Sequence, residues 1–360
     1  MVVVNVIEID GSVGEGGGQV VRTSVALAAL LGKDIQILNV RAKRRPPGFR
    51  PQHIVGVRAV ARLSQAHVEG LVTSSTELTF KPKTRLPGEF IFEIGTAGSI
   101  PLVLQALIPS TAFSPGPVKI SLGGGTDVRW SPPIDYMRYV VLRVLRRLGY
   151  RANLSVVRRG HYPRGGGRVV VEVKPVRKLT SFVLTEFGEV ERVRGLSHCV
   201  RLPRHVAERQ ANTAVKILEE AGYGDVSVER EWYDPGEDPH LGPGSGVVLY
   251  AETTSGAVLG ADALGERGKP AEVVGREAAE KLLKELGSGM PVDRHMGDML
   301  IPYMAVADGV STVGVSEVTM HLLTNVEITE MITGVKFDVD GALGEPGEIS
   351  VDGLGLINQF

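Results

Sequence analysis

The sequence has a single cysteine, Cys199, among its 360 residues. One thiol cannot form an internal disulfide or a zinc site made of several thiolates, so a reducing compartment is expected. Lysine and arginine number 40 against 41 aspartates and glutamates, and the formal net charge is −1. This balance excludes a generally basic surface as the means of binding nucleic acid, so any polyanion site must be a local cationic cluster.

Long apolar runs are also missing. No stretch reaches the roughly 18 apolar residues that a membrane span needs. The apolar start lacks the basic region and cleavage site of a signal peptide, so we interpret residues 4–10 as a first strand. We therefore expect a cytoplasmic protein with no membrane partner.

Glycine and proline are plentiful, at 45 and 21 residues, and divide the chain into many short segments. Strand-like and helix-like patterns alternate between them, which indicates an α/β (α+β) fold. Three rounds of strand, glycine-rich turn, apolar helix and strand suggest a threefold internal repeat. The helices predicted in these rounds are 19–32, 51–66, 99–113, 295–308 and 322–334.

Residues 183–287 differ from the rest of the chain in composition and in their pattern of apolar residues. A solvated helix is predicted at 203–224, a strand at 247–254 and a charged helix at 270–287, with a proline- and acid-rich loop before the strand. We interpret 183–287 as a smaller α/β domain inserted into a large domain made of residues 1–182 and 288–360.

The stretch GSVGEGGGQVVR, residues 11–22, combines five glycines with Glu15 and Arg22. Its glycines match neither the P-loop nor the dinucleotide-binding register. A tight structural turn is one interpretation. The other is a phosphate cradle, in which Glu15 holds a divalent cation while Arg22 and the helix N-terminus hold phosphate oxygens.

Residues 40–53, VRAKRRPPGFRPQH, form the densest cationic stretch. A run of charge is usually a solvated face, but guanidinium groups outnumber ammonium groups here and bind phosphate bidentately. The two interpretations stay open. Two further glycine-rich stretches, 123–136 and 160–168, are weaker signals, and the second is equally well a loop between paired strands.

None of the eight histidines has the spacing of a strong metal-binding motif. His321 is placed where a strand ends and a helix begins. The positive end of a helix dipole favours a neutral, nucleophilic imidazole and attracts phosphate. The residues alone do not choose between His321 and His53.

Taken together, seven segments resemble the RNA 3′-terminal phosphate cyclase family. They follow one another from the first glycine-rich turn to residue 325: DGSVGEGGGQVVR, RAKRRPPGFRPQH, GTAGSIPLVLQALIP, GGTDVRWSPPIDY, HYPRGGG, GDMLIPYMA and HLLTN. The resemblance implies a large domain of three βαβαββ-like units with a smaller inserted α/β domain.

The resemblance also implies a reaction in three nucleotidyl-transfer steps. A histidine attacks the α-phosphate of ATP, releases pyrophosphate and forms a histidinyl-AMP. The AMP passes to the 3′-phosphate of an RNA end, and the vicinal 2′-hydroxyl then closes a 2′,3′-cyclic phosphate. The implied partners are ATP, a divalent metal (Mg²⁺ or Mn²⁺) and phosphorylated RNA 3′ ends, and a homo-oligomer is compatible with them.

By motif, His321 matches the adenylated nucleophile and Glu15 the metal carboxylate. The positions that match ATP- and phosphate-binding residues are Arg22, Arg41, Arg44, Gln52, His53, Gln105, Pro132, His295 and Asp298. Pro132 resembles the adenine-side wall. His295 stands where some relatives are expected to have tyrosine, and it ranks behind His321 as a rival nucleophile.

Three other functions remain open at this point. A cyclase-like protein without catalysis, serving in ribosome assembly, would lack the nucleophile, so His321 weighs against it. An enolpyruvyl transferase of the same architecture would need neither ATP nor a covalent nucleotide. A pure RNA-binding module would prefer internal single strands to phosphorylated ends.

Overall fold

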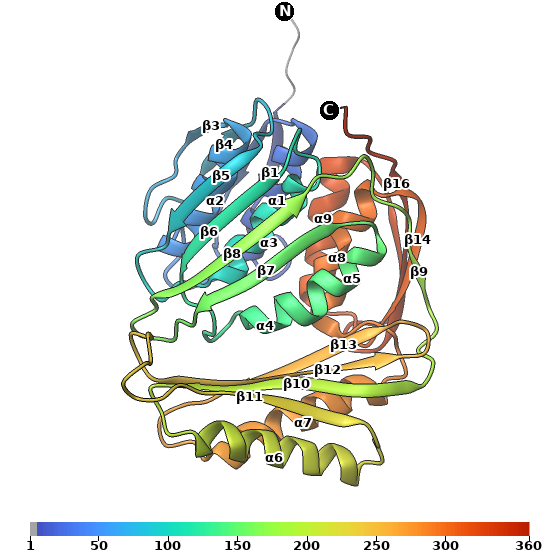
Figure 1. Cartoon of the computed structure of the whole chain (residues 1–360). Coiled ribbons are helices and arrows are strands. Elements are labelled where there is room, and N and C mark those ends of the chain that lie inside the picture. Colours follow the sequence, from blue (N-terminus) through green and yellow to red (C-terminus); the bar gives the residue numbers. More distant parts are fainter. Residues whose placement is uncertain (1–5, 360) are drawn as a thin grey trace, which may run out of the picture.

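Three four-stranded sheets of identical topology lie around a set of apolar helices (Figure 1). The structure is a computed structural model that describes residues 6–359. The predicted first strand at 4–10 therefore begins partly outside the described residues. In each of these sheets, two parallel strands are followed by two antiparallel ones, in the spatial order first, second, fourth, third.

The first repeat supplies the strand order β1-β2-β4-β3. Its elements are β1 (Ile7–Asp10), α1 (Gly18–Leu31), β2 (Ile35–Leu38), α2 (Pro51–Ser64), β3 (His67–Glu69) and β4 (Leu78–Lys81). Helices α1 and α2 follow β1 and β2, so the glycine-rich turn and the cationic stretch both lie just before a helix N-terminus.

The second repeat gives the order β5-β6-β8-β7. Its elements are β5 (Gly88–Glu93), α3 (Ile100–Thr111), β6 (Val118–Gly124), α4 (Ile134–Tyr136), η1 (Met137–Val141), α5 (Leu142–Arg147), β7 (Arg151–Arg158) and β8 (Gly167–Lys174). The second helical segment contains η1, a π-helical turn that the sequence analysis did not foresee. The stretch 160–168 connects β7 to its antiparallel neighbour β8, as the simpler interpretation held.

The third repeat gives β9-β14-β16-β15. Its elements are β9 (Val183–Leu184), α8 (Arg294–Val306), β14 (Asp308–Val315), α9 (Met320–Thr333), β15 (Phe337–Asp340) and β16 (Gly347–Leu354). The threefold repeat is therefore confirmed. The five predicted repeat helices are also confirmed, as α1, α2, α3, α8 and α9, with ends shifted by a few residues.

A fourth sheet, of order β11-β10-β12-β13, interrupts the third repeat between β9 and α8. Its elements are β10 (Val190–Val200), α6 (His205–Glu220), β11 (Val226–Glu231), β12 (Gly244–Thr253), β13 (Val258–Leu264) and α7 (Ala271–Gly287). Both helices lie on the far side of this sheet from the three repeats (Figure 1). The boundaries 183 and 287 stay a prediction, and β9 pairs with β14, so residues 183–184 lie in the third sheet.

Helix α1 is buried on almost every side. Residues 23–30 are all buried, and α1 packs against α2, α3 and α9. A helix that is apolar all round can only be accommodated inside the protein. Gly32 ends it by taking the left-handed conformation, with a φ of 66°. Helix α1 therefore lies at the centre of the large domain, where it contacts helices from all three repeats.

Asp293 joins the fourth sheet to the repeats. Its buried carboxylate accepts hydrogen bonds from the Tyr136 hydroxyl (2.6 Å) and from the backbone N–H of Gly260 on β13 (2.9 Å). It also caps α8 by accepting from the N–H groups of His295 and Met296, both at 3.0 Å. One side chain thus connects α4, β13 and α8.

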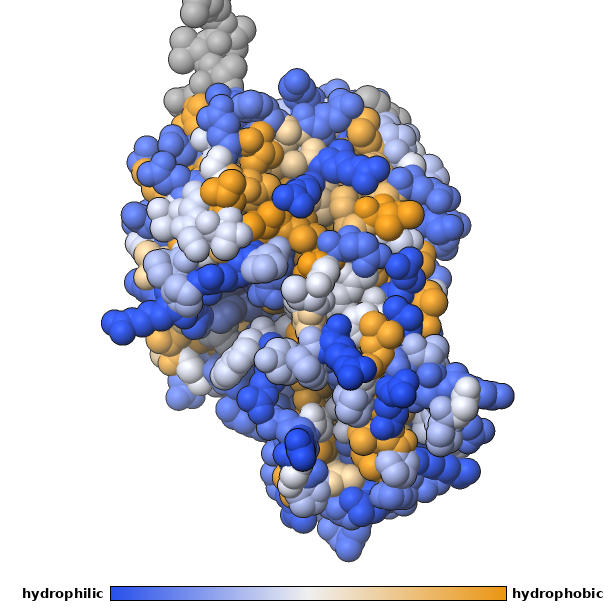
Figure 2. Space-filling view, turned by 90° about the vertical axis from the view of Figure 1, so that its left-hand side faces the viewer, coloured by the Kyte–Doolittle hydropathy of each residue, from blue (hydrophilic) through white to orange (hydrophobic). Residues whose placement is uncertain are grey.

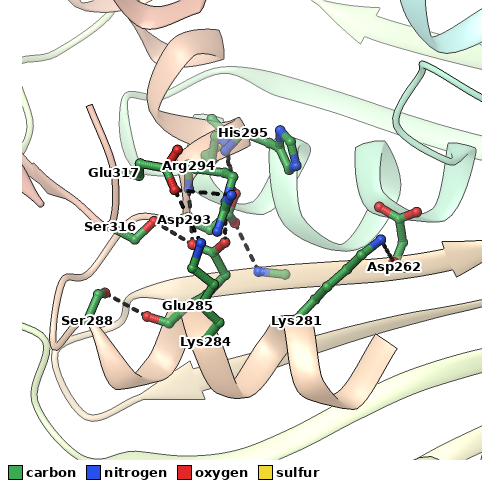
Figure 3. Close-up of polar contacts among 12 residues, drawn as sticks. Asp262, Lys281, Lys284, Glu285, Ser288, Asp293, Arg294, His295, Ser316 and Glu317 are labelled. Carbon is green, nitrogen blue, oxygen red and sulfur yellow. Dashed lines mark hydrogen bonds and ion pairs between the residues drawn. The ribbon is translucent and has the colours of Figure 1, made fainter. Parts of the chain in front are cut away.

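The end of α7 holds the segment that leads into α9. Glu285 is buried and accepts from Arg294 Nε at 2.6 Å and from the Ser316 hydroxyl, and Arg294 also pairs with Glu317 at 3.1 Å (Figure 3). Buried charges are held only where they are paired and hydrogen-bonded. The inserted domain therefore fixes residues 316–317, three to four positions before the first turn of α9.

The side of the molecule drawn in Figure 2 carries apolar residues mainly on its upper part, and hydrophilic residues cover most of its lower part. Within residues 6–359, no helix combines the length and apolar character that crossing a bilayer requires.

We expect Asp293→Ala to lower the free energy of unfolding by about 3–5 kcal/mol, because it leaves a buried hydroxyl and a buried N–H without an acceptor and removes a helix cap. Denaturant titration followed by circular dichroism measures this loss. Asp338→Ala, at an exposed position on β15, is the matched control and should change stability little. An equal effect of both substitutions would show that Asp293 does not hold the junction.

Candidate active site

The glycine-rich turn before α1 and the first turn of α9 meet at Glu15 and His321. Glu15 Oε1 lies 2.8 Å from His321 Nδ1, although the residues are 306 positions apart. Both side chains are partly open to solvent, at 31% and 44%. The first and third repeats therefore contribute one side chain each to a single, accessible site.

The contact between α1 and α9 sets this geometry. Gln19 donates to the His321 carbonyl at 2.8 Å, and the Thr23 hydroxyl donates to Asn325 Oδ1 at 2.6 Å. Gly14 has a φ of 55°, and any side chain there would collide with the Thr324 hydroxyl. The bareness of this turn is thus needed for the turn to approach α9 closely.

The cationic stretch closes over the same turn. Arg44 Nη2 lies 2.8 Å from Glu15 Oε2, and Lys43 Nζ donates to the Gly14 carbonyl at 2.7 Å. Arg41 takes a left-handed backbone conformation and donates to the Gly48 carbonyl at 2.7 Å, which holds the loop in its bend. The loop thereby presents cationic groups beside Glu15 and His321.

The environment of His321 favours its neutral form. Burial lowers the pKa of His321 below the ordinary value of 6.5, Arg22 and Arg44 lower it further, and Glu15 raises it. Thr319 caps α9 by accepting from Leu322 N at 3.0 Å, so the imidazole is in the first turn, where the helix dipole acts in the same direction. With Nδ1 facing a carboxylate, the neutral ring carries its proton on Nδ1 and exposes a lone pair on Nε2.

Arg22, His53 and Asp298 interact electrostatically behind this pair, with His53 and Asp298 buried and Arg22 partly buried. Burial raises the pKa of Asp298 to about 8, and Arg22 opposes that rise. Burial lowers the pKa of Arg22 to about 10 and that of His53 to about 3, and Arg22 contributes to the shift of His53. Gly18 packs against the His53 ring. These shifts mark a dry, electropositive pocket wall of the kind found at functional sites.

His53 differs from His321 in its surroundings. It is only 8% exposed, and its Nδ1 accepts from the backbone N–H of Arg50 at 3.2 Å, which caps α2. The residues alone left the two histidines undecided, and the resemblance to the family selected His321. The structure brings the partly open His321 to Glu15 and encloses His53 between α1 and α2.

Three other predicted residues belong to the second repeat or contact it. Gln52 Oε1 accepts from Ser99 N at 3.4 Å, and Gln105 Nε2 lies 3.6 Å from Met299 Sδ, next to Asp298. Pro132 follows Ser131, whose hydroxyl is hydrogen-bonded to that of Ser99. The second repeat thus reaches the site through Ser99 at the start of α3.

His295 lies apart from this group. It is exposed at the start of α8 (Figure 3). Its ring packs edge-on against that of Tyr136, with centroids 6.4 Å apart. Its backbone N–H belongs to the Asp293 cap. The predicted site residues are therefore not all in mutual contact, and His295 lies toward the inserted domain.

The sequence analysis did not single out Gln19 or Asn325, which hold α1 and α9 in register. Asn325 also donates to the Asp298 carbonyl at 2.7 Å, so it connects α8 as well. Asn325 lies four positions after His321, and residues four apart share a helix face. This spacing could have predicted that Asn325 lies on the same side of α9 as His321.

Comparison with known proteins identifies the family of this chain. Residues 13–339 match the family model described as RNA 3′-terminal phosphate cyclase. Proteins of that name from Hyperthermus butylicus and Methanopyrus kandleri are 55% and 52% identical to this chain. The first alignment covers 97% of this chain and 98% of the relative, and the second covers 96% and 99%.

Among solved structures, the enolpyruvyl transferase NikO from Streptomyces tendae aligns with a TM-score of 0.34 at 10% identity, over 95% of this chain and 47% of that one. A likeness this low carries no weight for fold or activity. The full-length sequence identities decide the question: the chain belongs to the RNA 3′-terminal phosphate cyclase family.

Proposed function

We propose that this protein converts an RNA 3′-terminal phosphate into a 2′,3′-cyclic phosphate at the expense of ATP, through covalent histidinyl-AMP and RNA-adenylate intermediates. The observation that carries the proposal is the Glu15–His321 pair, set among Arg22, Arg44 and His53 on the motif positions of the family. Membership of that family supplies the substrate class.

His321 is the proposed nucleophile for the first step. Its Nε2 lone pair attacks the α-phosphorus of ATP, and the bond to the bridging oxygen breaks as pyrophosphate leaves. Glu15 accepts the Nδ1–H and so holds the ring orientation and supports the positive charge that forms on it. This is the role that a carboxylate plays in other histidine-containing catalytic arrangements.

The arginines would bind the triphosphate. Arg44 lies beside Glu15, and Arg22 and Arg44 both act electrostatically on His321, so these guanidinium groups are proposed to neutralise the negative charge of the transferring phosphate. Positioning and charge neutralisation dominate the catalysis of phosphoryl transfer. Gln52, Gln105, Pro132 and Asp298 are proposed to complete the nucleotide pocket.

Glu15 also suits a divalent cation, Mg²⁺ or Mn²⁺, because a partly exposed carboxylate is the oxygen ligand that such ions prefer. When bound, the ion would neutralise triphosphate charge and polarise the leaving group. The turn between β1 and α1 would present Glu15 to it, and Arg44, which pairs with Glu15, would add a second cationic group.

In the second step the 3′-phosphate of RNA attacks the histidinyl phosphorus, and His321 leaves as the neutral imidazole that its surroundings favour. In the third, the vicinal 2′-hydroxyl attacks the activated phosphate and AMP departs. The cytoplasm and a homo-oligomeric state remain predictions from the sequence.

Product analysis tests the proposed activity directly. A 3′-phosphorylated oligoribonucleotide incubated with ATP and Mg²⁺ or Mn²⁺ should yield the 2′,3′-cyclic phosphate and AMP, whereas a 3′-hydroxyl oligonucleotide should not react. Phosphoenolpyruvate should neither replace ATP nor raise the melting temperature. Stabilisation by phosphoenolpyruvate alone, with no cyclic product, would instead favour an enolpyruvyl transferase.

The covalent step isolates the nucleophile. With α-labelled ATP and a divalent metal, the parent protein should acquire an acid-labile, base-stable label, and His321→Ala should acquire none. His67→Ala, at an exposed ring on β3, is the control and should label normally. Undiminished labelling of His321→Ala would exclude His321 as the nucleophile, and His295→Ala would then identify or exclude the rival.

The pH dependence tests the electrostatics of the pair. Because the pKa of His321 lies below 6.5, the rate of self-adenylation should be level near neutrality and fall as the pH drops through that lowered value. Glu15→Gln should move this acid limb to lower pH and slow adenylation about 10- to 100-fold, while leaving the melting temperature unchanged. Arg44→Ala should move the limb to higher pH, since Arg44 lowers the pKa of His321.

The essential result is that the acid limb moves to lower pH in Glu15→Gln and to higher pH in Arg44→Ala. Each pH–rate profile is normalised to its own maximum rate before the comparison. Lys216→Ala, on the exposed face of α6, is the control for loss of a surface charge. Shifts in the same direction would mean that His321 does not control the acid limb, and unfolding of Glu15→Gln would restore the interpretation of this turn as purely structural.

A further inference from the structure

A second group of titratable side chains lies buried where the second repeat meets the inserted domain. Asp127 follows β6, His161 follows β7, and His198 is on β10 of the fourth sheet. The three side chains come from segments far apart in the sequence and are 2%, 7% and 1% exposed. The proposed cyclase reaction uses none of them.

The spacing of these groups matches that of metal ligands. One ligand atom from each residue lies within 4.8 Å of the other two, and His161 Nε2 is 3.3 Å from His198 Nε2. Two nitrogens bound tetrahedrally to Zn²⁺ at about 2.0–2.1 Å are separated by roughly 3.3 Å. The distance between the two Nε2 atoms therefore equals the distance expected between two nitrogen ligands of one Zn²⁺ ion.

The third group has an open oxygen. Asp127 Oδ2 accepts from the Thr126 hydroxyl at 2.6 Å, whereas Oδ1 is buried without a hydrogen-bond partner among residues 6–359. His161 and His198 approach one another through their Nε2 atoms, and a metal ion would take the lone pair of each neutral ring. A buried carboxylate oxygen beside two neutral imidazoles needs a proton or a cation to satisfy it.

The charge around the group is unbalanced. The buried guanidinium of Arg159 lies 3.5 Å from Asp127, 2.7 Å from Asp135 and 2.7 Å from Glu231. Three carboxylates against one guanidinium leave an excess of two negative charges when all are ionised. A divalent cation would cancel this excess, and uncompensated buried charge is strongly unfavourable.

A further histidine lies beside the group. His240 is buried, its Nδ1 is 2.8 Å from Asp238 Oδ1, and its Nε2 has no hydrogen-bond partner in the part of the chain that the structure describes. It is close enough to His161 to affect that ring electrostatically. His240 is therefore a neighbour of the cluster and is not one of its three proposed ligands.

We propose that Asp127, His161 and His198 bind one Zn²⁺-class divalent cation, which fastens the inserted domain to the second repeat. Two imidazole nitrogens and one carboxylate oxygen suit Zn²⁺ or Co²⁺ and not Mg²⁺, which prefers oxygen ligands alone. The site is separate from the cation expected at Glu15, and its three protein ligands leave a fourth coordination position for water.

Metal binding to the untagged full chain tests this proposal without ATP or RNA, so its outcome is independent of the cyclase activity. After removal of metals with a chelator, titration with Zn²⁺ should show one tight equivalent per chain and a higher melting temperature. Co²⁺ should give visible absorption bands of nitrogen–oxygen coordination. Elemental analysis of the reloaded, desalted protein measures the stoichiometry.

Asp127→Asn and His198→Asn should each weaken this binding at least about tenfold and abolish the rise in melting temperature. His67→Asn, an exposed histidine on β3, and His321→Ala are the controls and should keep the equivalent. If either substitution of the cluster unfolds the protein, the Co²⁺ spectrum of the parent chain decides the question.

Two results would overturn the proposal. One is a chelator-treated parent chain that takes up no Zn²⁺ and shows no cobalt bands. The other is an equivalent that disappears in His321→Ala and persists in His198→Asn, because the ion would then sit beside Glu15. In either case protons on the carboxyl groups, and not a cation, satisfy the buried charge.

Discussion

The contact between α1 and α9 is the constraint on which the proposed active site depends. It brings the first and third repeats together through two hydrogen bonds. Gln19 donates to the His321 carbonyl, and the Thr23 hydroxyl donates to the Asn325 side chain. Glycine is needed at position 14 for the turn to come this close to α9, because a side chain there would collide with Thr324. The contact between α1 and α9 is what brings Glu15 to His321.

The inserted domain interrupts the third repeat between β9 and α8, directly before the elements that carry His321. Its connection to them is polar and buried: Asp293 caps α8 while holding β13, and Glu285 holds the segment before α9. Such contacts are costly to break, because each removed partner leaves a buried polar group unsatisfied. The inserted domain is therefore connected by buried hydrogen bonds to the segment that leads into α9.

The apolar patterns of the sequence predicted the fold well, since local periodicity decides where a helix runs and which face it buries. The helices α1, α2, α3, α8 and α9 all follow it. Short strands leave a weaker signal, and those not foreseen were β3, β4, β9, β10, β11, β13 and β16. The π-helical turn η1 was missed for another reason: its extra residue per turn is imposed by packing and has no sequence pattern of its own.

By itself, the sequence determined the fold class, the threefold repeat, the cationic loop and the motifs that hold Glu15 and His321. The tertiary structure alone decided which histidine is accessible beside Glu15, because burial depends on contacts between helices that are distant in sequence. It also brought together His161, His198 and Asp127, whose spacing along the chain matches no metal motif. Distances between repeats arise from packing, which no single segment encodes.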